Sequence, residues 1–349
     1  MITRSISACL IGAAVGTAGL IGANVALAAK VDGPKVNWDL STWGAKRTAT
    51  AGTEELARLV SEATDGNFAI KIHYGETLGP IREALDGLSV GAFQIAFTCT
   101  AYTPGKLPTF DGISLPFLPA PTIEHLRAMR EGFLTSPVPH TDAARWGISV
   151  VSALPNSANE FLGKGKPPKS LADFKGMRLR ALGGDAAAMK LIGAVPQNMP
   201  LTEVYGGMER GLLDATSSVL SSLVSFKLQE VGSWFTTNMA LSSAPCLIFA
   251  GTKAMEALPP QYRKLIQDSA PAVSDHWMTV FKRDDDAAAE AFRAKGLVAV
   301  ALPESELDTL RQQVRPIWDA WVEQMDKLGH NGKQLLQLII DSAKKPKVS

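Results

Sequence analysis

The residues best suited to chemistry in this sequence are two arginines, Arg178 and Arg180, in the largely apolar segment Met177 to Leu182. This segment is predicted to be a strand, so side chains two positions apart share one face. A guanidinium group presents a planar fork of donors that matches a carboxylate, and such a charge-assisted pair contributes about 1.5–3 kcal/mol. The arginines could therefore bind an anionic ligand, although an arginine on a strand more often forms a surface salt bridge.

Motifs for nucleotide or metal chemistry are missing from the sequence. It has neither the Gly-x-x-x-x-Gly-Lys-Ser/Thr phosphate loop nor Gly-x-Gly-x-x-Gly after a predicted strand. The five histidines never fall at metal-ligand spacing with one another or with cysteine. The run Asp284-Asp285-Asp286 lies in a predicted helix, where adjacent side chains diverge, so we expect a solvated acidic turn. We therefore predict no metal and no cofactor, while scattered catalytic residues would leave no local motif.

The N-terminal residues 1–28 are predicted to be a secretory signal peptide. Residues 1–7 carry one arginine and no acidic residue, and an apolar run rich in glycine and alanine follows from residue 8 to residue 29. Ala26-Leu27-Ala28 offers small residues where a signal peptidase cleaves, so cleavage after Ala28 is expected. The alternative is a retained membrane anchor, because the run is long enough to span a bilayer.

Composition limits the class of protein further. The chain has 349 residues, of which 46% are hydrophobic and 20% charged, and its formal net charge is +1. This length suits two domains, and the near-zero charge argues against a nucleic-acid partner. Cys99 and Cys246 lie in apolar segments, where a buried free thiol is the commoner fate. Whether they form a disulfide stays open, since the presence of two cysteines does not establish a bond between them.

Hydrophobic periodicity predicts two sets of strands and helices. The first third reads strand, helix, strand, helix, strand over residues 36–41, 48–64, 68–73, 80–91 and 93–97. The following elements are a helix at 123–133, strands at 148–153, 177–182, 243–250 and 297–302, helices at 185–193 and 202–211, one or two long helices over 258–295, and amphipathic segments from 304 to 343. The alternation predicts an α/β protein with two lobes and more than one crossing between them.

A series of short motifs runs through the middle of the chain. These motifs are Lys166-Pro167, Asp173-Phe174-Lys175-Gly176-Met177-Arg178-Leu179-Arg180, Gly193-Ala194-Val195-Pro196, Glu203-Val204-Tyr205 and Gly211-Leu212-Leu213-Asp214. In order and spacing they resemble the substrate-binding proteins of tripartite ATP-independent periplasmic (TRAP) transporters, often called the dicarboxylate-binding type. Further segments match in the same order, among them Glu62-Ala63-Thr64-Asp65-Gly66 and Leu115-Pro116-Phe117-Leu118. The resemblance covers nearly the whole mature chain.

The resemblance implies an α/β, two-lobed periplasmic binding protein fold with a hinge and a long helix crossing both lobes. We assign residues 29–149 and 240–278 to lobe I, and residues 150–239 and 279–343 to lobe II. The implied location is the periplasm. The implied partners are a small organic acid and the membrane subunits of a TRAP transporter, and we expect a monomer.

The resemblance also suggests site residues. In the family, the arginine at the position of Arg180 pairs with the ligand carboxylate, so Arg180 is the predicted anchor and Arg178 is structural. Where many members carry Asn or Trp, this chain has Ser217 or Ser218. The other predicted ligand-binding residues are Trp43, Glu76, Thr98, Asn159, Phe161 and Tyr205.

The substrate prediction depends on a missing residue. Some members carry a second arginine shortly before the Lys-Pro pair, but residues 156–161 contain none here. This absence argues against a doubly charged ligand and favours a monocarboxylate with an apolar or aromatic body. Its walls would come from the aromatic candidates Trp43, Phe97, Phe161 and Trp234. The alternatives are an exported α/β enzyme acting on a small carboxylate and a protein that reports ligand to a membrane sensor.

Overall fold

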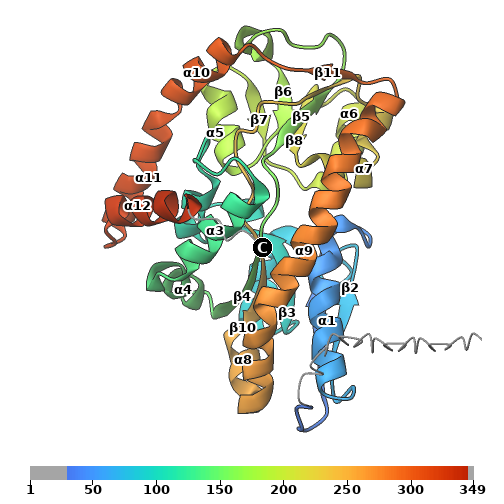
Figure 1. Ribbon diagram of the computed structural model, residues 1–349, viewed down its shortest axis with the longest axis vertical. Coiled ribbons are helices and arrows are strands. Elements are labelled where there is room, and N and C mark those ends of the chain that lie inside the picture. Colours follow the sequence, from blue (N-terminus) through green and yellow to red (C-terminus); the bar gives the residue numbers. More distant parts are fainter. Residues whose placement is uncertain (1–29, 345–349) are drawn as a thin grey trace, which may run out of the picture.

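The computed structural model describes residues 30–344, and the predicted signal peptide lies outside the described residues. The first sheet has the strand order β2-β1-β3-β10-β4. Its strands are β1 (Val36–Ser41), β2 (Phe68–His73), β3 (Ile95–Cys99), β4 (Ile148–Leu154) and β10 (Cys246–Gly251). β1 is parallel to β2 and β3, whereas β10 is antiparallel to both β3 and β4. This sheet forms the lower half of the molecule in Figure 1.

The second sheet has the strand order β11-β9-β5-β8-β6-β7. Its strands are β5 (Glu160–Gly163), β6 (Arg178–Arg180), β7 (Val195–Gln197), β8 (Ala215–Ser218), β9 (Trp234–Thr236) and β11 (Val298–Val300). β6 lies between β7 and β8 and is parallel to both, which places Arg180 opposite Gln197 and Thr216. The two separate sheets confirm the predicted mixed α/β fold (Figure 1).

Helices cover both sheets. They are α1 (Ala51–Ala63), α2 (Ala84–Val90), α3 (Ile123–Leu134), α4 (Pro137–Ala144), α5 (Gly183–Leu191), α6 (Val204–Glu209), α7 (Leu220–Ser225), α8 (Thr252–Ala257), α9 (Pro260–Ala294), α10 (Glu304–Gln313), α11 (Arg315–Lys327) and α12 (Gly332–Ala343). Short 3-10 helices at Thr48–Thr50 (η1), Thr100–Tyr102 (η3) and Pro108–Ser114 (η4) follow β1 and β3 along the chain. The helix α1 shows the local logic: Leu56 and Val60, four residues apart, are fully buried on one face.

The 35-residue helix α9 connects the two halves of the molecule. Along its length it packs on α1 and β4 of the first half and then on α7 of the second, as its course in Figure 1 shows. The buried residues of α9 likewise belong to different hydrophobic cores along its length. Trp277 and Phe281 belong to the hydrophobic core of the first sheet, whereas Phe292 belongs to a core of the second. This helix corresponds to the long helix predicted over residues 258–295.

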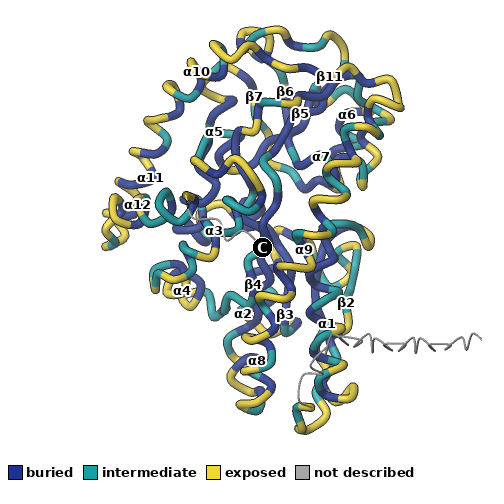
Figure 2. The backbone as a smooth tube through the Cα atoms, in the orientation of Figure 1, coloured by how far each residue is buried: buried dark blue, intermediate teal, exposed yellow. Residues whose placement is uncertain are grey.

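The last two helices, α11 and α12, pack on the first half of the molecule. Trp318 and Trp321 of α11 and Ile339 of α12 are part of the first core, and α12 lies against α3. Figure 2 shows the buried residues concentrated along the two sheets and the helix faces toward them. The hydrophobic pattern of residues 315–343, which were assigned to lobe II, is therefore explained by packing against the first sheet's core, whereas Leu307 and Leu310 of α10 pack in a core of the second half.

The lobe boundaries remain a prediction, but the pairing of the strands favours a different position for the boundary at 149/150. β4 crosses the predicted boundary at 149/150 and pairs with β10 as far as Leu154. A boundary after Leu154 keeps this sheet intact, because a break at 149/150 would divide a paired strand between two lobes.

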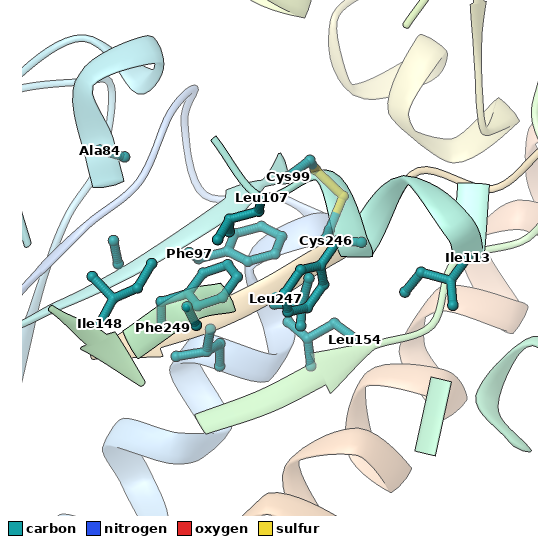
Figure 3. Close-up of a cluster of buried hydrophobic side chains, with 14 of the residues drawn as sticks. Ala84, Phe97, Cys99, Leu107, Ile113, Ile148, Leu154, Cys246, Leu247 and Phe249 are labelled. Atoms are coloured by element: carbon teal, nitrogen blue, oxygen red, sulfur yellow. A yellow bond between two sulfur atoms is a disulfide. The ribbon is translucent and has the colours of Figure 1, made fainter. Parts of the chain in front are cut away.

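Cys99 and Cys246 form a disulfide, so the expectation of free thiols was wrong. The two residues lie directly opposite each other in the antiparallel pair of β3 and β10. The backbone N–H of Thr100 donates to the carbonyl of Pro245, which places the cysteines at a non-hydrogen-bonded position, where facing side chains are closest. The bond joins residues 147 positions apart, beside Phe97 and Phe249 in the first core (Figure 3).

Candidate functional site

A cavity of about 50 Å³ lies between the two sheets. The segments after the carboxyl ends of β1 and β3 contribute to it from the first half, and the ends of β6 and β8 contribute from the second. Ligands in open α/β sheets commonly bind at the carboxyl ends of strands. Its polar lining residues are Arg47, Tyr102, Asn156, Asn159, Arg180, Ser217, Ser218 and Ser222, and its aromatic ones include Trp43, Phe97, Phe226, Trp277 and Phe281.

Arg180 is the last residue of β6 and is only 4% exposed. Its Nε donates to the carbonyl of Met199 at 3.0 Å, and its Nη1 donates to the carbonyl of Ser217 at 2.7 Å. Its Nη2 lies 3.4 Å from the hydroxyl of Tyr102, on the first half of the molecule. Within residues 30–344, no carboxylate forms an ion pair with it. Burial lowers the pKa of the guanidinium, and the field of Tyr102 and Asp185 opposes that shift.

Asp185, in the first turn of α5, is fully buried and belongs to a polar network behind the cavity wall. Its carboxylate accepts hydrogen bonds from the side-chain amide of Asn159 at 2.8 Å and from the hydroxyl of Ser242 at 2.6 Å. Burial raises the pKa of Asp185, while the hydrogen bonds from Ser242 and Asn159 oppose the shift. The network holds Asn159 in place beside Arg180, because a satisfied buried network fixes its members' orientation.

Five of the nine predicted ligand-binding residues line the cavity. They are Trp43, Asn159, Arg180, Ser217 and Ser218, and the candidate wall residue Phe97 joins them, stacked on the Trp43 ring with 4.8 Å between centroids. The structure therefore brings together residues from both halves that are far apart in the sequence.

The other four predicted residues are not among those that line the cavity. Glu76 accepts a hydrogen bond from the backbone N–H of Ile81 at 2.7 Å, and Thr98 is buried within β3. Phe161 packs edge-to-face on Phe174 in the second core, and Tyr205 donates to Glu230 at 3.3 Å. The wall candidate Trp234 is likewise fully buried in that core.

Arg47 is the main site residue that the sequence analysis missed. It stands in the segment between β1 and η1, which carries no motif and has no regular hydrophobic period. Its guanidinium reaches the cavity from the first half of the molecule, opposite the strand that holds Arg180. The sequence analysis found no second arginine because it considered only residues 156–161, whereas Arg47 lines the same cavity as Arg180.

Two charged groups outside the cavity have structural partners. Arg178 is exposed and forms a bidentate pair with Asp214, with Nε–Oδ2 at 3.0 Å and Nη2–Oδ1 at 2.7 Å. The acidic run of α9 differs from the expected solvated turn, because Asp284 accepts from Thr48 Oγ1 and Asp285 accepts from the backbone N–H of Ser221.

Two local features bear on catalysis. Residues 87–91 have the spacing Gly-x-Ser-x-Gly, but Ser89 lies in the last turn of α2, and a nucleophile elbow requires a sharp strand-to-helix turn. In the part of the chain that the structure describes, no three His, Cys, Asp or Glu side chains gather in a way that could hold a metal ion.

The same part contains no helix with the length and apolar surface needed to cross a bilayer.

Two α/β halves that enclose a cavity with buried arginine define a two-lobed ligand-binding protein. Residues 40–325 match the family described as bacterial extracellular solute-binding protein, family 7. The chain belongs to this family.

Known relatives and solved structures agree with this family. The chain is 24% identical over 265 residues to the 2,3-diketo-L-gulonate-binding periplasmic protein YiaO of Escherichia coli, covering 74% of this chain and 80% of the relative. Its fold is similar to a marine metagenome TRAP solute-binding protein specific for aromatic acid ligands, with a TM-score of 0.81 at 20% identity over 90% of this chain and 100% of the other. A TRAP solute-binding protein from Rhodoferax ferrireducens in complex with benzoate gives a TM-score of 0.78 at 22% identity, covering 88% and 98%.

Proposed function

We propose that this chain captures a small organic acid in the periplasm and delivers it to the membrane subunits of a TRAP transporter, without chemical change to the acid. The observation that carries the proposal is Arg180, a buried cation in the cavity wall that has no ion-pair partner among the described residues. A buried charge is costly unless it is paired, so an anionic ligand would stabilise it.

Arg180 is rigidly positioned for this role. Two backbone carbonyls hold its Nε and Nη1, so the orientation of its remaining donors is set before a ligand arrives. A donor that is already oriented loses less entropy on binding. The neighbouring Ser218 and Asn159 supply neutral polar groups for the rest of the ligand.

The size of the cavity favours a compact acid. A cavity of about 50 Å³ exceeds the space that one water needs, but it is well below the roughly 150 Å³ of a cavity that binds benzene. An aromatic ring would require the walls to separate, whereas an acid of a few carbon atoms needs little movement. The proposal therefore gives less weight to the aromatic body that the sequence analysis considered.

Lobe closure provides the coupling to transport. The cavity walls come from both halves of the molecule, so a ligand that contacts both walls binds the closed arrangement better than an open one. Closure also removes the anion and Arg180 from water, which strengthens their interaction. The membrane subunits would then distinguish loaded from empty receptor by its shape.

A thermal-shift screen tests this function. The mature protein is heated with dicarboxylates, 2-oxo acids, aromatic acids, sugar acids and neutral sugars, alongside Arg180→Ala and the exposed control Arg178→Ala. Ligand at about 100 times its Kd adds about 2.7 kcal/mol, which raises the Tm by several degrees. We expect a rise with one class of acid that Arg180→Ala loses and Arg178→Ala keeps. Turnover of the acid, or stabilisation by neutral sugars alone, would contradict the proposal.

A further inference from the structure

Arg47 is held in the cavity wall between two aromatic rings. Its Cζ lies 4.7 Å from the centroid of Trp43 and 5.3 Å from that of Phe226. Gly44 has φ of +65° and makes room for this arrangement, because a Cβ there would lie 2.9 Å from Phe226 Cζ and 3.0 Å from Arg47 Nη1. The stacking fixes the plane of the guanidinium group.

Only one nitrogen of the Arg47 guanidinium is hydrogen-bonded. Nη1 donates to the carbonyl oxygens of Trp43 and Ala45, the latter at 2.9 Å. Nε and Nη2 are buried and have no hydrogen-bond partner, and within residues 30–344 no carboxylate forms an ion pair with this side chain. Burial without a counter-charge lowers the pKa of Arg47 to about 10. Unpaired buried donors are costly, so an acceptor at this edge would be strongly favoured.

The free edges of the two arginines differ. In Arg180, Nε and Nη1 donate hydrogen bonds to backbone carbonyls. Only Nη2 is left, and its one contact is a long hydrogen bond to the hydroxyl of Tyr102. Arg47 instead presents Nε and Nη2 together, which is the edge that binds a carboxylate through two parallel hydrogen bonds. The two side chains line the same cavity from opposite halves of the molecule.

We propose that Arg47 is the ligand-binding residue of the first lobe and takes an oxygen-acceptor group of the ligand on its Nε–Nη2 edge. The ligand is then an organic acid with two oxygen-acceptor groups: a carboxylate that binds Arg180 and a second group that binds Arg47. This assignment rests on the proposed function. It also explains closure, since an acid held by one arginine from each lobe joins the two lobes directly.

Matched ligands test the assignment. Malonate and succinate are compared by calorimetry with 3-methylbutanoate and 4-methylpentanoate, in which an isopropyl group of similar shape replaces the second carboxylate. We expect the wild-type protein to prefer a dicarboxylate over its branched partner by at least about 30-fold. Arg47→Met should reduce that preference to within about threefold, while Arg180→Met should weaken both ligands. The exposed control Arg178→Met should bind like wild type.

A second readout separates ligand binding from a structural role. Replacing a buried, uncompensated cation with an apolar residue of similar length is often neutral or stabilising. Arg47→Met also leaves the carbonyl oxygens of Trp43 and Ala45 without a donor, so its ligand-free Tm should stay within a few degrees of that of wild type, whereas removing a side chain that mainly supports the fold would lower the Tm further. A fall of several degrees, or unchanged preference in Arg47→Met, overturns the role of Arg47 while leaving organic-acid capture intact. Binding of branched acids alone also overturns it, and binding of no acid refutes the proposed function itself.

Discussion

Asp284 and Asp285 are neighbours in α9, yet they accept hydrogen bonds from opposite halves of the molecule, each from a residue next in sequence to one that lines the cavity. The Asp284 carboxylate accepts from Thr48 Oγ1 at 2.6 Å, next to Arg47 in the first half of the molecule. The Asp285 carboxylate accepts from the backbone N–H of Ser221 at 2.9 Å, at the start of α7 in the second. One turn of the long helix therefore connects the two halves beside the cavity, and its acidic residues help to position the segments that carry the lining.

Removing the Asp285 carboxylate should loosen α7. In Asp285→Ala the backbone N–H of Ser221 loses its acceptor, which we expect to cost about 1–2 kcal/mol. Hydrogen exchange of residues 220–226 should accelerate by about tenfold in this variant. Asp286→Ala is the matched control, because Asp286 is exposed in the same turn of α9. Equal exchange rates in the two variants would show that the hydrogen bond does not order α7.

Arg180 should be intolerant of a conservative change. A lysine cannot donate to Met199 and Ser217 and also present a planar fork to an acid, so Arg180→Lys should weaken acid binding by about 10–100-fold. The carbonyl oxygens left without a donor should also lower stability by about 1–3 kcal/mol. Calorimetry with the best acid of the screen measures the first effect, and urea unfolding measures the second. Wild-type affinity in Arg180→Lys would mean that only the charge of Arg180 matters.

The elements of the fold could largely be predicted because their signals are local. Alternating residues predicted β1 and β2, and the apolar residues of α9 recur at helical spacing from Tyr262 to Phe292. Which sheet each element joins was harder. β10 follows the second-lobe strands in sequence but pairs with β3 and β4, and residues 240–278 were assigned to lobe I only through the resemblance, whereas α12 was assigned to lobe II and packs on α3. These contacts depend on tertiary packing, and no local pattern predicts them.

Sequence motifs account for only part of the cavity lining, because Trp43 and Asn159 line it without standing in a motif. Arg180 stands in a recognisable motif, whereas Arg47 lies in an irregular segment and becomes relevant only because Trp43 and Phe226 orient it. Glu76 and Tyr205 were predicted from their positions, at a strand end and in the Glu-Val-Tyr motif, but their side chains form local hydrogen bonds. The cysteine pairing likewise follows from the register of β3 and β10, whose cysteines are 147 residues apart.

The disulfide should contribute substantially to stability. Cross-linking residues this far apart restricts the unfolded chain, and loss of a native disulfide typically costs about 2–5 kcal/mol. The double variant Cys99→Ser/Cys246→Ser should therefore unfold at a lower temperature than wild type. Dithiothreitol provides the control, since it should lower the wild-type Tm to that of the variant and leave the variant unchanged. Identical Tm values without reductant would mean that the bond does not stabilise the fold.

Stability should depend on pH through Glu160. Burial raises the pKa of this carboxyl to about 7, even though it accepts hydrogen bonds from Thr236 and the backbone N–H groups of Met239 and Ala240. The folded protein therefore keeps a proton that the unfolded chain, with an ordinary pKa near 4.5, releases.

The free energy of unfolding should then fall as the pH rises between about 4.5 and 7, by at most about 3 kcal/mol from this group. Glu160→Gln cannot ionise but keeps an oxygen that accepts hydrogen bonds, so it should lack this contribution. Urea unfolding of both proteins from pH 5 to pH 8 measures the difference between their free energies of unfolding. Groups that titrate in both proteins, such as Asp111, cancel in this difference. The variant should gain stability relative to wild type as the pH rises, because only the wild type must then bury a charged carboxylate. A constant difference across this range would mean that Glu160 is already ionised in the folded protein at pH 5, with its hydrogen bonds outweighing the cost of burial.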